Sequence, residues 1–387
     1  MKELENILKK MMINPVKRDI INRIEIHTLI DGEYIDSAKN IFLRKCKIDL
    51  TPYKANKISI HPLLQKYCKL KKSESKLIFI DTETTGLLGG TGTIPFLIGL
   101  GYFQNSAFII KQYFLTELNG EKLMLNKLIK NFPQNTTFVS FNGKSFDISL
   151  LQSRFILNEI SFPIKTFDQI DLLHISRRIW KNRLSDFSLK SLEKNVLEIV
   201  RNDELEIPGS EIPAEYFYYL DTKNASMIKN ILYHNEQDIV NLAKLFFKVN
   251  EILNYDFHSM QNNQIDIFNI AKFYEDCNLI DKAQIYYGKL LKSDYDQKAT
   301  KQLSFIFKRK NNWGKAIKLW EIAALRDEIY AMIELAKWEE HKNDDFNKAL
   351  IWTEKAIEIY SKGYDFQLKQ MTELSCRKER LIKKLNI

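Results

Sequence analysis

The sequence predicts an α/β domain with a mixed sheet and flanking helices, followed by an all-α region of helical repeats. Two observations predict this architecture. An apolar, β-branched segment at 76–82 opens a series in which strand-like and helical patterns alternate. After about residue 264 the strand patterns stop, and Lys-Ala pairs recur every 33 residues. We therefore expect three regions, at 1–74, 75–255 and 264–387.

The first region is basic. Residues 1–74 contain 16 Lys and Arg against 9 Asp and Glu, within a chain of net charge +9. We expect a short amphipathic helix at 1–20, short strands within 21–60 around the turn signal Asp31-Gly32, and a polar linker at 69–76. The excess charge would attract a polyanion such as nucleic acid, but it fits a merely soluble basic surface equally well.

Composition excludes several classes of protein. Hydrophobic residues make up 45% and charged residues 28%, as in ordinary globular proteins. No apolar run approaches the roughly 20 residues that a membrane span needs. The opening residues lack the apolar core of a secretion signal, and the four cysteines are scattered without a C-x-x-C motif. We expect reduced thiols, a cytoplasmic location and no membrane partner.

The second region contains the strands. We expect strands at 76–82, 95–103, 106–114 and 136–141, and helices at 118–132, 168–181, 187–197 and 224–252. The first three strands are joined closely enough for an antiparallel meander, and Ser145 is a candidate cap for a further helix. Three antiparallel strands followed by helix, strand and helix are typical of a ribonuclease H-like fold. We expect its mixed five-stranded sheet with flanking helices.

The third region carries the repeat. Lys-Ala pairs stand at 282–283, 315–316 and 348–349, and a small residue (Ala271, Ser304, Ala336) precedes each pair at a similar distance. Tetratricopeptide repeats have a period of about 34 residues and pack paired helices through small side chains. The third unit is degenerate, because Thr353 replaces the large residue found in the first two. An unrelated helical bundle with alanine-rich contacts remains the alternative.

Two acids end the first predicted strand. Asp81 and Glu83 are two residues apart, so in a strand both side chains point to the same face. Neighbouring carboxylates repel one another, and a divalent cation relieves that repulsion. For so short a motif alone, a strand that ends in a polar turn is the better explanation, and the rest of the chain must decide.

Two further acids are candidates for the same site. Asp147 falls in the first turn of the helix after the fourth strand, where the helix dipole alone also favours an acid. Asp238 lies in a late helix beside the apolar residues 239–240, with His234 one turn earlier on the same face. A charge on a solvated face and a structural histidine are the alternatives.

Together these motifs resemble the DEDD exonuclease superfamily, in which the four acids would be Asp81, Glu83, Asp147 and Asp238. A closer resemblance spans about residues 24–360. It rests on the stretch from Asp81 to Leu87, Gly99-Leu100-Gly101, Asp171-Leu172-Leu173-His174, Ile207-Pro208-Gly209, His234-Asn235-x-x-Asp238 and Glu334-Leu335-Ala336-Lys337. The chain thereby resembles the bacterial YprB-type ribonuclease H-like proteins. This resemblance implies an exonuclease domain at 75–255 and tetratricopeptide-like repeats at 264–387.

The chain departs from the superfamily at one position. The tyrosine subclass has Tyr four residues before the last acid, and the histidine subclass has His five before. Here His234 takes the first spacing, and Tyr233 precedes it. The general base therefore stays open between His234 and Tyr233.

The resemblance implies two Mg²⁺ or Mn²⁺ ions, which would stabilise charge on the attacking and leaving oxygens of a phosphodiester. In this scheme Asp81, Glu83 and Asp147 hold the nucleophile-side ion, Asp81 also holds the other, and Asp238 completes the first site. His234 orients or deprotonates the attacking water. The candidate substrate contacts are Thr82, Thr84, Asn142, Arg177 and Arg178, for which a plain connector, a turn or a solvated helix face are the alternatives.

The function expected from the sequence is a metal-dependent 3′–5′ exonuclease acting on single-stranded DNA or RNA. A ribonuclease H-like endonuclease would use the same acids. A non-catalytic nucleic-acid-binding adaptor, recruiting a protein partner through the repeats, is the third possibility.

Overall fold

The computed structural model describes residues 23–50, 59–71, 75–86, 92–105, 107–202, 204–254, 264–362 and 368–386. These residues fall into two compact units, one within 1–177 and 186–254 and the other within 178–185 and 255–387. We call them the nuclease-fold unit and the repeat unit. The helix expected at 1–20 and the glycine-rich segment 87–91 lie outside the described residues.

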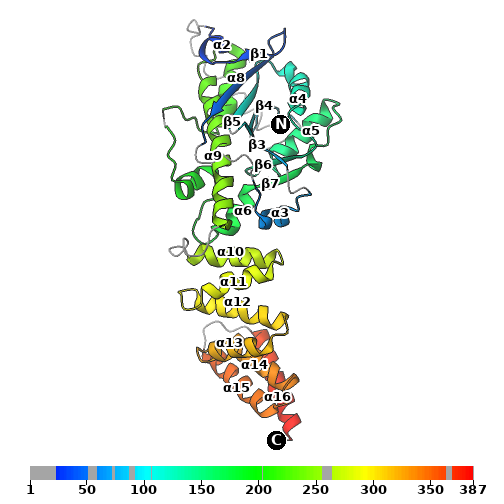
Figure 1. Cartoon of the computed structure of the whole chain (residues 1–387), viewed down its shortest axis with the longest axis vertical. Coiled ribbons are helices and arrows are strands. Elements are labelled where there is room, and N and C mark those ends of the chain that lie inside the picture. Colours follow the sequence, from blue (N-terminus) through cyan, green and yellow to red (C-terminus); the bar gives the residue numbers. More distant parts are fainter. Residues whose placement is uncertain are drawn as a thin grey trace. The chain divides into compact units, whose positions relative to one another are not determined.

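The nuclease-fold unit is built on one mixed sheet (Figure 1). In the described part of the chain the sheet has seven strands in the order β1-β2-β5-β4-β3-β6-β7. The strands are β1 (Glu33–Tyr34), β2 (Ile41–Ile48), β3 (Lys76–Thr84), β4 (Pro95–Gln104), β5 (Ala107–Leu115), β6 (Thr136–Ser140) and β7 (Asp168–Asp171). The expected five strands were therefore too few. The short strands predicted within 21–60 are present, and they extend this sheet beyond β5.

The strand pairing follows from the lengths of the connections. β3, β4 and β5 pair antiparallel, as predicted. β6 pairs parallel with β3, and β7 pairs parallel with β6. Each of these parallel steps requires a crossover, and helices α4 (Glu121–Ile129) and α5 (Asp147–Leu157) provide them.

Several helix predictions need correction. Residues 168–171 form β7 and not the start of a helix, because this segment pairs with β6, and α6 (Leu172–Ile179) begins only after it. Ser145 does not cap α5, whose N-cap position is Phe146 without a side-chain cap. The remaining elements of this unit are α2 (Ile26–Leu29), α3 (Pro62–Cys68), η1 (Leu118–Gly120), η2 (Ile164–Thr166), α7 (Leu189–Leu192), η3 (Glu193–Leu197), α8 (Ile212–Thr222) and α9 (Ile228–Asn254).

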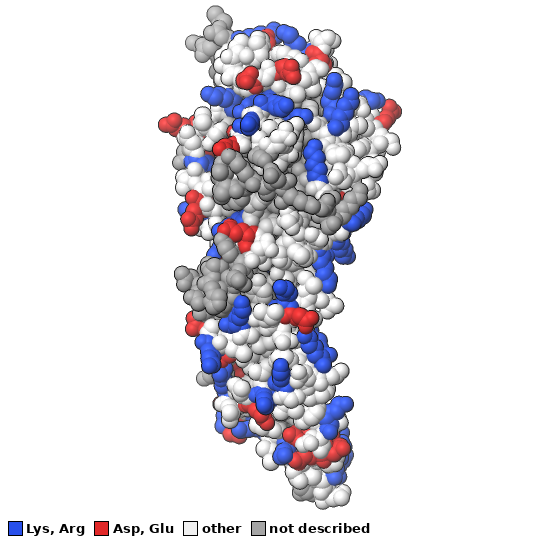
Figure 2. Space-filling model, in the orientation of Figure 1, with Lys and Arg blue, Asp and Glu red and all other residues white. Residues whose placement is uncertain are grey.

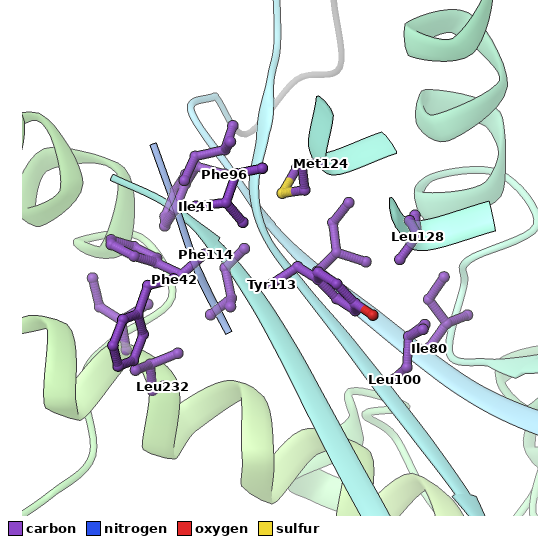
Figure 3. Packing of buried hydrophobic residues seen from close by; sticks show 14 of the residues in the cluster. Ile41, Phe42, Ile80, Phe96, Leu100, Tyr113, Phe114, Met124, Leu128 and Leu232 are labelled. Atoms are coloured by element: carbon purple, nitrogen blue, oxygen red, sulfur yellow. The ribbon is translucent and has the colours of Figure 1, made fainter. Parts of the chain in front are cut away.

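The two faces of the sheet are covered by different helices. Ile78 and Ile80 belong to the same buried cluster as Met124 and Leu128 of α4 (Figure 3). Phe79, which lies between the two isoleucines and points the other way, makes an edge-to-face ring contact with Phe246 of α9. Thus α4 packs against one face of β3, and α9 packs against the other.

Within residues 264–362 and 368–386, which the structure describes, the repeat unit contains three successive helix pairs and a last helix. They are α10 (Gln264–Asp276), α11 (Ile280–Lys289), α12 (Asp296–Arg309), α13 (Trp313–Ala324), α14 (Ile329–His341), α15 (Phe346–Lys362) and α16 (Leu368–Leu385). The alanines of the three Lys-Ala pairs, Ala283, Ala316 and Ala349, are fully buried. So are the preceding small residues Ala271, Ser304 and Ala336. The small side chains predicted to lie between the repeat helices are therefore buried, which both a tetratricopeptide-like repeat and an alanine-rich helical bundle require.

Three properties of the surface and the chain bear on function. Among the described residues, no helix combines the length and the apolar character that crossing a membrane requires. None of the four cysteines, all of which the structure describes, forms a disulfide. Figure 2 shows Lys and Arg interspersed with Asp and Glu over the visible face, so charge alone does not mark a binding surface there.

Candidate active site

The first two candidate acids lie at the end of β3. The residues before them, from Leu77 to Ile80, are buried and fix the strand in the centre of the sheet. The pairing of β3 with β6 ends at Phe79, whereas β3 itself continues to Thr84. Asp81 and Glu83 therefore follow the last pair with β6, on the α9 face of the strand.

Asp147 reaches the same strand end from α5. It is the first residue of the helix, 9% exposed, and its Oδ1 accepts a 2.6 Å hydrogen bond from Thr82 Oγ1. Thr82 alternates with Asp81 and Glu83, so its side chain points to the opposite face of the strand. Asp147 thus approaches β3 from the side of Thr82, beyond the end of the β3–β6 pairing.

A buried acid holds the turn that precedes Asp147. Asp171 is 5% exposed, and its carboxylate accepts hydrogen bonds from the backbone N–H of Asn142 (2.9 Å) and of Lys144 (3.3 Å). Asn142 has a left-handed φ of 61°, which Asn tolerates better than most residues. The β-carbon of any residue replacing Gly143 would lie 2.5 Å from Ser140 Cβ and 2.9 Å from Asp147 Oδ2. This close approach requires glycine.

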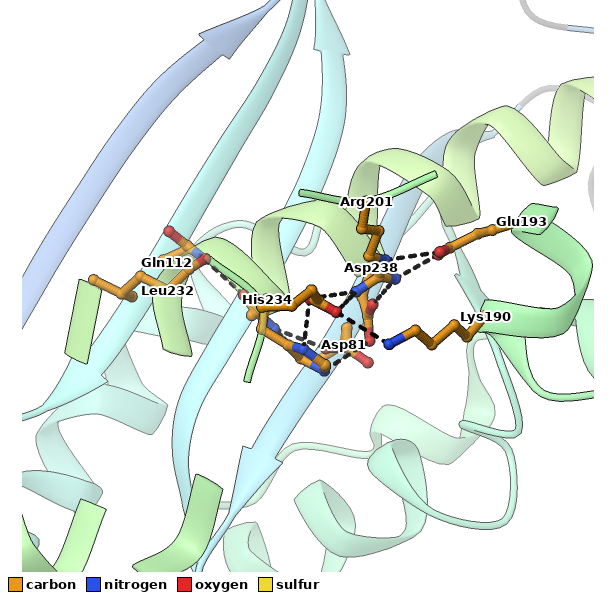
Figure 4. Close-up of polar contacts among 10 residues, drawn as sticks. Asp81, Gln112, Lys190, Glu193, Arg201, Leu232, His234 and Asp238 are labelled. Atoms are coloured by element: carbon orange, nitrogen blue, oxygen red, sulfur yellow. Dashed lines mark hydrogen bonds and ion pairs between the residues drawn. The ribbon is translucent and has the colours of Figure 1, made fainter. Parts of the chain in front are cut away.

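Asp238 comes from α9 and is ion-paired to a buried arginine. The Arg201 side chain is 5% exposed and pairs with Asp238, Glu193 and Glu206 (Figure 4). Its Nη1 lies 3.1 Å from Oε1 of Glu206. One guanidinium therefore serves three carboxylates. Burial alone would lower its pKa, but Glu193 and Asp238 raise it.

His234 lies between two of these acids. Its Nδ1 is 3.1 Å from Oε1 of Glu206, and its Nε2 is 3.6 Å from Oδ2 of Asp238. The imidazole is 16% exposed, and both ring nitrogens face carboxylates. Tyr233, the alternative base, is half-buried one residue earlier on the same helix, about 100° around its axis.

The acids influence one another electrostatically. Burial raises the pKa of Asp81 well above 3.8, and the charges of Asp238 and Asp147 raise it further. Burial, followed by the charge of Asp81, likewise raises the pKa of Glu83 well above 4.5. The pKa of Asp147 rises to about 6 through burial, although its hydrogen bond with Thr82 lowers it. The four candidate acids thus lie within electrostatic range of one another, with a surplus of negative charge.

This donor set has the chemistry of a hard-cation site. Carboxylate oxygens are the ligands that Mg²⁺ and Mn²⁺ prefer, and a divalent cation would relieve the repulsion that raises these pKa values. Within the described residues, however, no three Asp, Glu, His or Cys side chains lie close enough to hold one ion. Asp147 instead faces Thr82, and Asp238 faces Arg201.

The candidate substrate contacts are less uniform. The hydroxyl of Thr82 donates a hydrogen bond to Asp147, and the hydroxyl of Thr84 donates one to the carbonyl of Gly86 (2.8 Å). Arg178 pairs with Asp276 of α10 at 2.6 Å, inside the repeat unit. Arg177 is exposed, and no described residue forms an ion pair with it. Among the basic candidates, Arg177 is the more available for a phosphate.

Sequence reasoning assigned no role to several residues that shape the site. Arg201 and its partner Glu206 lie in polar segments without a recognisable motif. Its other partner, Glu193, belongs to the stretch Ser191-Leu192-Glu193 of the family resemblance, which was given no role. Asn235, which donates to Asp81 Oδ2 at 2.8 Å, stands beside His234 in a motif that drew attention only to its acid and histidine. Phe146, 49% exposed and adjacent to Asp147, belongs to the Asn-x-x-x-Phe-Asp motif of the superfamily resemblance, in which only the asparagine and the acid were given roles.

Comparison with known proteins agrees with the fold. The family model for the RNase_H superfamily matches residues 78–250. The chain is 30% identical over 292 residues to the uncharacterized protein YprB of Bacillus subtilis (strain 168), covering 74% of this chain and 70% of YprB. Ribonuclease H-like nucleases act on nucleic acid and generally use divalent metal ions. The chain belongs to the YprB-type ribonuclease H-like family.

Proposed function

We propose that this protein is a metal-dependent 3′–5′ exonuclease that hydrolyses phosphodiester bonds of single-stranded DNA or RNA. The observation that carries the proposal is the gathering of four acids around the end of β3, where burial and the charges of Asp238 and Asp147 raise the pKa values of Asp81 and Glu83. Burying this much like charge is costly for folding alone. A site that binds divalent cations would explain why these carboxylates are buried close together.

The proposed ligands are Asp81, Glu83, Asp147 and Asp238, which would hold two Mg²⁺ or Mn²⁺ ions. The ions would supply Lewis-acid stabilisation of the phosphate and a more acidic attacking water. Asp238 would exchange its contact with Arg201 for this role. Because Arg201 keeps Glu193 and Glu206 as partners, it would remain neutralised.

Among the protein groups, His234 is the proposed base. Its Nδ1 contact with Glu206 favours the tautomer whose proton is on Nδ1, which leaves Nε2 free to accept a proton on the side of Asp238. Tyr233 remains the alternative. Replacing His234 by Gln and Tyr233 by Phe distinguishes them, because the larger loss of kcat identifies the base.

The proposed substrate contacts lie around the acids. Phe146 exposes an aromatic ring beside Asp147, and a nucleobase could stack on it. Arg177 would contact a phosphate. Asn142 would contribute its side chain, and Thr82 and Thr84 would act mainly by fixing Asp147 and the strand end.

Labelled oligonucleotides test the proposal. The full chain is incubated with single-stranded DNA and RNA labelled at the 3′ or the 5′ end, and with circular single strands, in Mn²⁺ and in a chelator. A 3′–5′ exonuclease releases the 3′ label as a mononucleotide at once, shortens the 5′-labelled strand stepwise and leaves circles intact. Cleaved circles would indicate the endonuclease. Binding without cleavage in Mn²⁺ would indicate the adaptor.

A further inference from the structure

A row of four residues crosses the sheet at Asp81. In the register of the strands, Asp81 of β3 lies opposite Gly99 of β4, Gly99 opposite Gln112 of β5, and Gln112 opposite Arg44 of β2. Residues paired in this way share one face of the sheet. That face is the one against which α9 packs. Three members of the row carry polar side chains, and the fourth has none.

The gap over Gly99 is filled from α9. A β-carbon on Gly99 would lie 2.2 Å from Asn235 Oδ1 and 2.3 Å from Ile239 Cδ1. Contacts this short do not occur for real β-carbons, so only glycine allows α9 to pack this close to the sheet. Asn235 itself is fully buried. Its amide therefore lies over Gly99, between Gln112 and Asp81.

The hydrogen bonds along the row all run toward Asp81. Arg44 Nη1 donates to Gln112 Oε1 at 2.7 Å. Gln112 Nε2 donates to Asn235 Oδ1 at 2.9 Å, and also to the carbonyl of Leu232 (Figure 4). Asn235 Nδ2 donates to Asp81 Oδ2 at 2.8 Å. Arg44, which also forms an ion pair with Glu236, thus stands at one end of an aligned chain of dipoles, and the Asp81 carboxylate stands at the other.

We propose that Asn235 is a positioning residue for Asp81, and that the relay through Gln112 extends this support to Arg44. Asn235 fixes one carboxylate oxygen of Asp81 and at the same time sets the spacing between α9 and β3. It thereby sets the distance between Asp81 and Asp238. Arg44 belongs to β2, which lies outside the residues matched by the RNase_H family model. Through this relay β2 would therefore help to support Asp81.

This inference rests on the proposed metal-dependent function. Hydrogen bonds that orient ligating side chains typically change metal affinity or activity 10–100-fold when removed. The competing explanation is that Asn235 is only a buried amide that stabilises the fold. The same helix offers a matched control, because Asn250 is 7% exposed, accepts from the backbone N–H of His61 and donates to the carbonyl of Phe246. None of these contacts involves a candidate acid.

The test compares Asn235→Leu with Asn250→Leu in the full chain. Both lose a buried amide and should lower the melting temperature. Calorimetric titration with Mn²⁺ should show about 10–100-fold weaker binding for Asn235→Leu, and binding within about twofold of wild type for Asn250→Leu. With a labelled oligonucleotide, Asn235→Leu should lower kcat without raising KM, because Asn235 does not touch the substrate.

Unchanged Mn²⁺ affinity in Asn235→Leu would overturn the inference. If wild-type protein binds no Mn²⁺, the proposed function fails, and this inference fails with it. The two failures are distinguishable, because the second is seen without any variant.

A glycine pair tests the same geometry if Asn235→Leu does not fold. A β-carbon on Gly101 would lie 2.5 Å from Ile239 Cγ2 and 2.5 Å from Phe108 Cζ, but it has no close contact with Asn235. The β-carbon added by Gly99→Ala and the one added by Gly101→Ala would both lie too close to Ile239. Only Gly99→Ala should displace Asn235 and weaken Mn²⁺ binding, and equal affinities in the two variants would contradict the proposal.

Discussion

Two charge clusters in the molecule have opposite character. In the nuclease-fold unit a single arginine, Arg201, faces an excess of acids: Asp238, Glu193 and Glu206 directly, with Asp81, Glu83 and Asp147 nearby. In the repeat unit a single buried acid, Glu340 of α14, faces an excess of cations on α16: Arg377, Arg380 and Lys384. We call them the Arg201 cluster and the Glu340 cluster.

The pKa shifts in the two clusters have opposite signs. The pKa of Asp147 is raised to about 6 by burial, and nearby acids raise those of Asp81 and Glu83 as well. Burial alone would raise the pKa of Glu340 too, but Arg380 and Arg377 lower it to about 2. The protein neutralises Glu340 with its own side chains, as a stabilising cluster requires. It leaves the Arg201 cluster negative, as a site that receives cations requires.

The largest expected effect is on turnover. Replacing Asp81 by Asn keeps the shape of the side chain but removes one charge from the Arg201 cluster. Loss of several kcal/mol of transition-state stabilisation corresponds to a decrease in kcat on the order of 10³-fold. Without metal the variant should melt at or above the wild-type temperature, because repulsion is relieved. Hydrolysis of an end-labelled oligonucleotide and thermal melting check both parts, and a lower melting temperature would contradict the surplus of charge.

The matching change in the Glu340 cluster should act on stability. Glu340→Gln leaves the buried part of Arg377 without its anion, and removing one partner of a buried pair costs about 3 kcal/mol. Urea denaturation followed by far-UV circular dichroism measures this loss. Nuclease activity of the folded fraction should not change. A free energy of unfolding equal to that of wild type would show that water hydrates the cations of α16 well enough without Glu340.

The two clusters should respond to pH in opposite directions in the absence of metal. Asp147 binds its proton more tightly in the folded protein, with a pKa of about 6 against an ordinary 3.8, so its contribution to stability falls as pH rises between these values. Glu340 has a folded pKa of about 2 against an ordinary 4.5, so its contribution rises as pH rises between these values.

Melting temperatures measured from pH 2 to pH 7 separate the two contributions. Relative to wild type, Asp147→Asn should gain stability as pH rises from about 4 to about 6, and Glu340→Gln should lose it as pH rises from about 2 to about 4.5. Parallel curves for wild type and Asp147→Asn would contradict the raised pKa.

The smallest expected effect is on substrate binding at the edge of the Arg201 cluster. Phe146→Ala removes a proposed stacking surface, and stacking contributes about 1–3 kcal/mol per base. We expect a rise in KM of about tenfold on single-stranded oligonucleotides, with kcat nearly unchanged. Leu157, exposed at the far end of α5, provides a control: Leu157→Ala should change neither constant.

Much of this comparison could be predicted from the sequence. The β-branched residues before Asp81 predicted β3, and alternation placed Asp81 and Glu83 on one face. The 33-residue spacing predicted which small residues of the repeat helices are buried. These patterns are local or periodic, so a single chain displays them.

The rest depends on contacts between distant residues. Nothing near Arg201 indicates that it pairs with Asp238, because that contact spans 37 residues and leaves no periodic signal. The alternation of β3 could not show that Asp147 approaches from the side of Thr82. Residues 168–171 lack a distinct strand pattern, and only pairing with β6 makes them β7. Short edge strands such as β1 likewise depend on their neighbour in the sheet.

Anomalous diffraction from crystals of the full chain soaked in Mn²⁺ tests the central claim most directly, because it locates the ions themselves. The account predicts two peaks among Asp81, Glu83, Asp147 and Asp238, with Asp238 turned away from Arg201. Peaks elsewhere, or none at these four carboxylates, would contradict it.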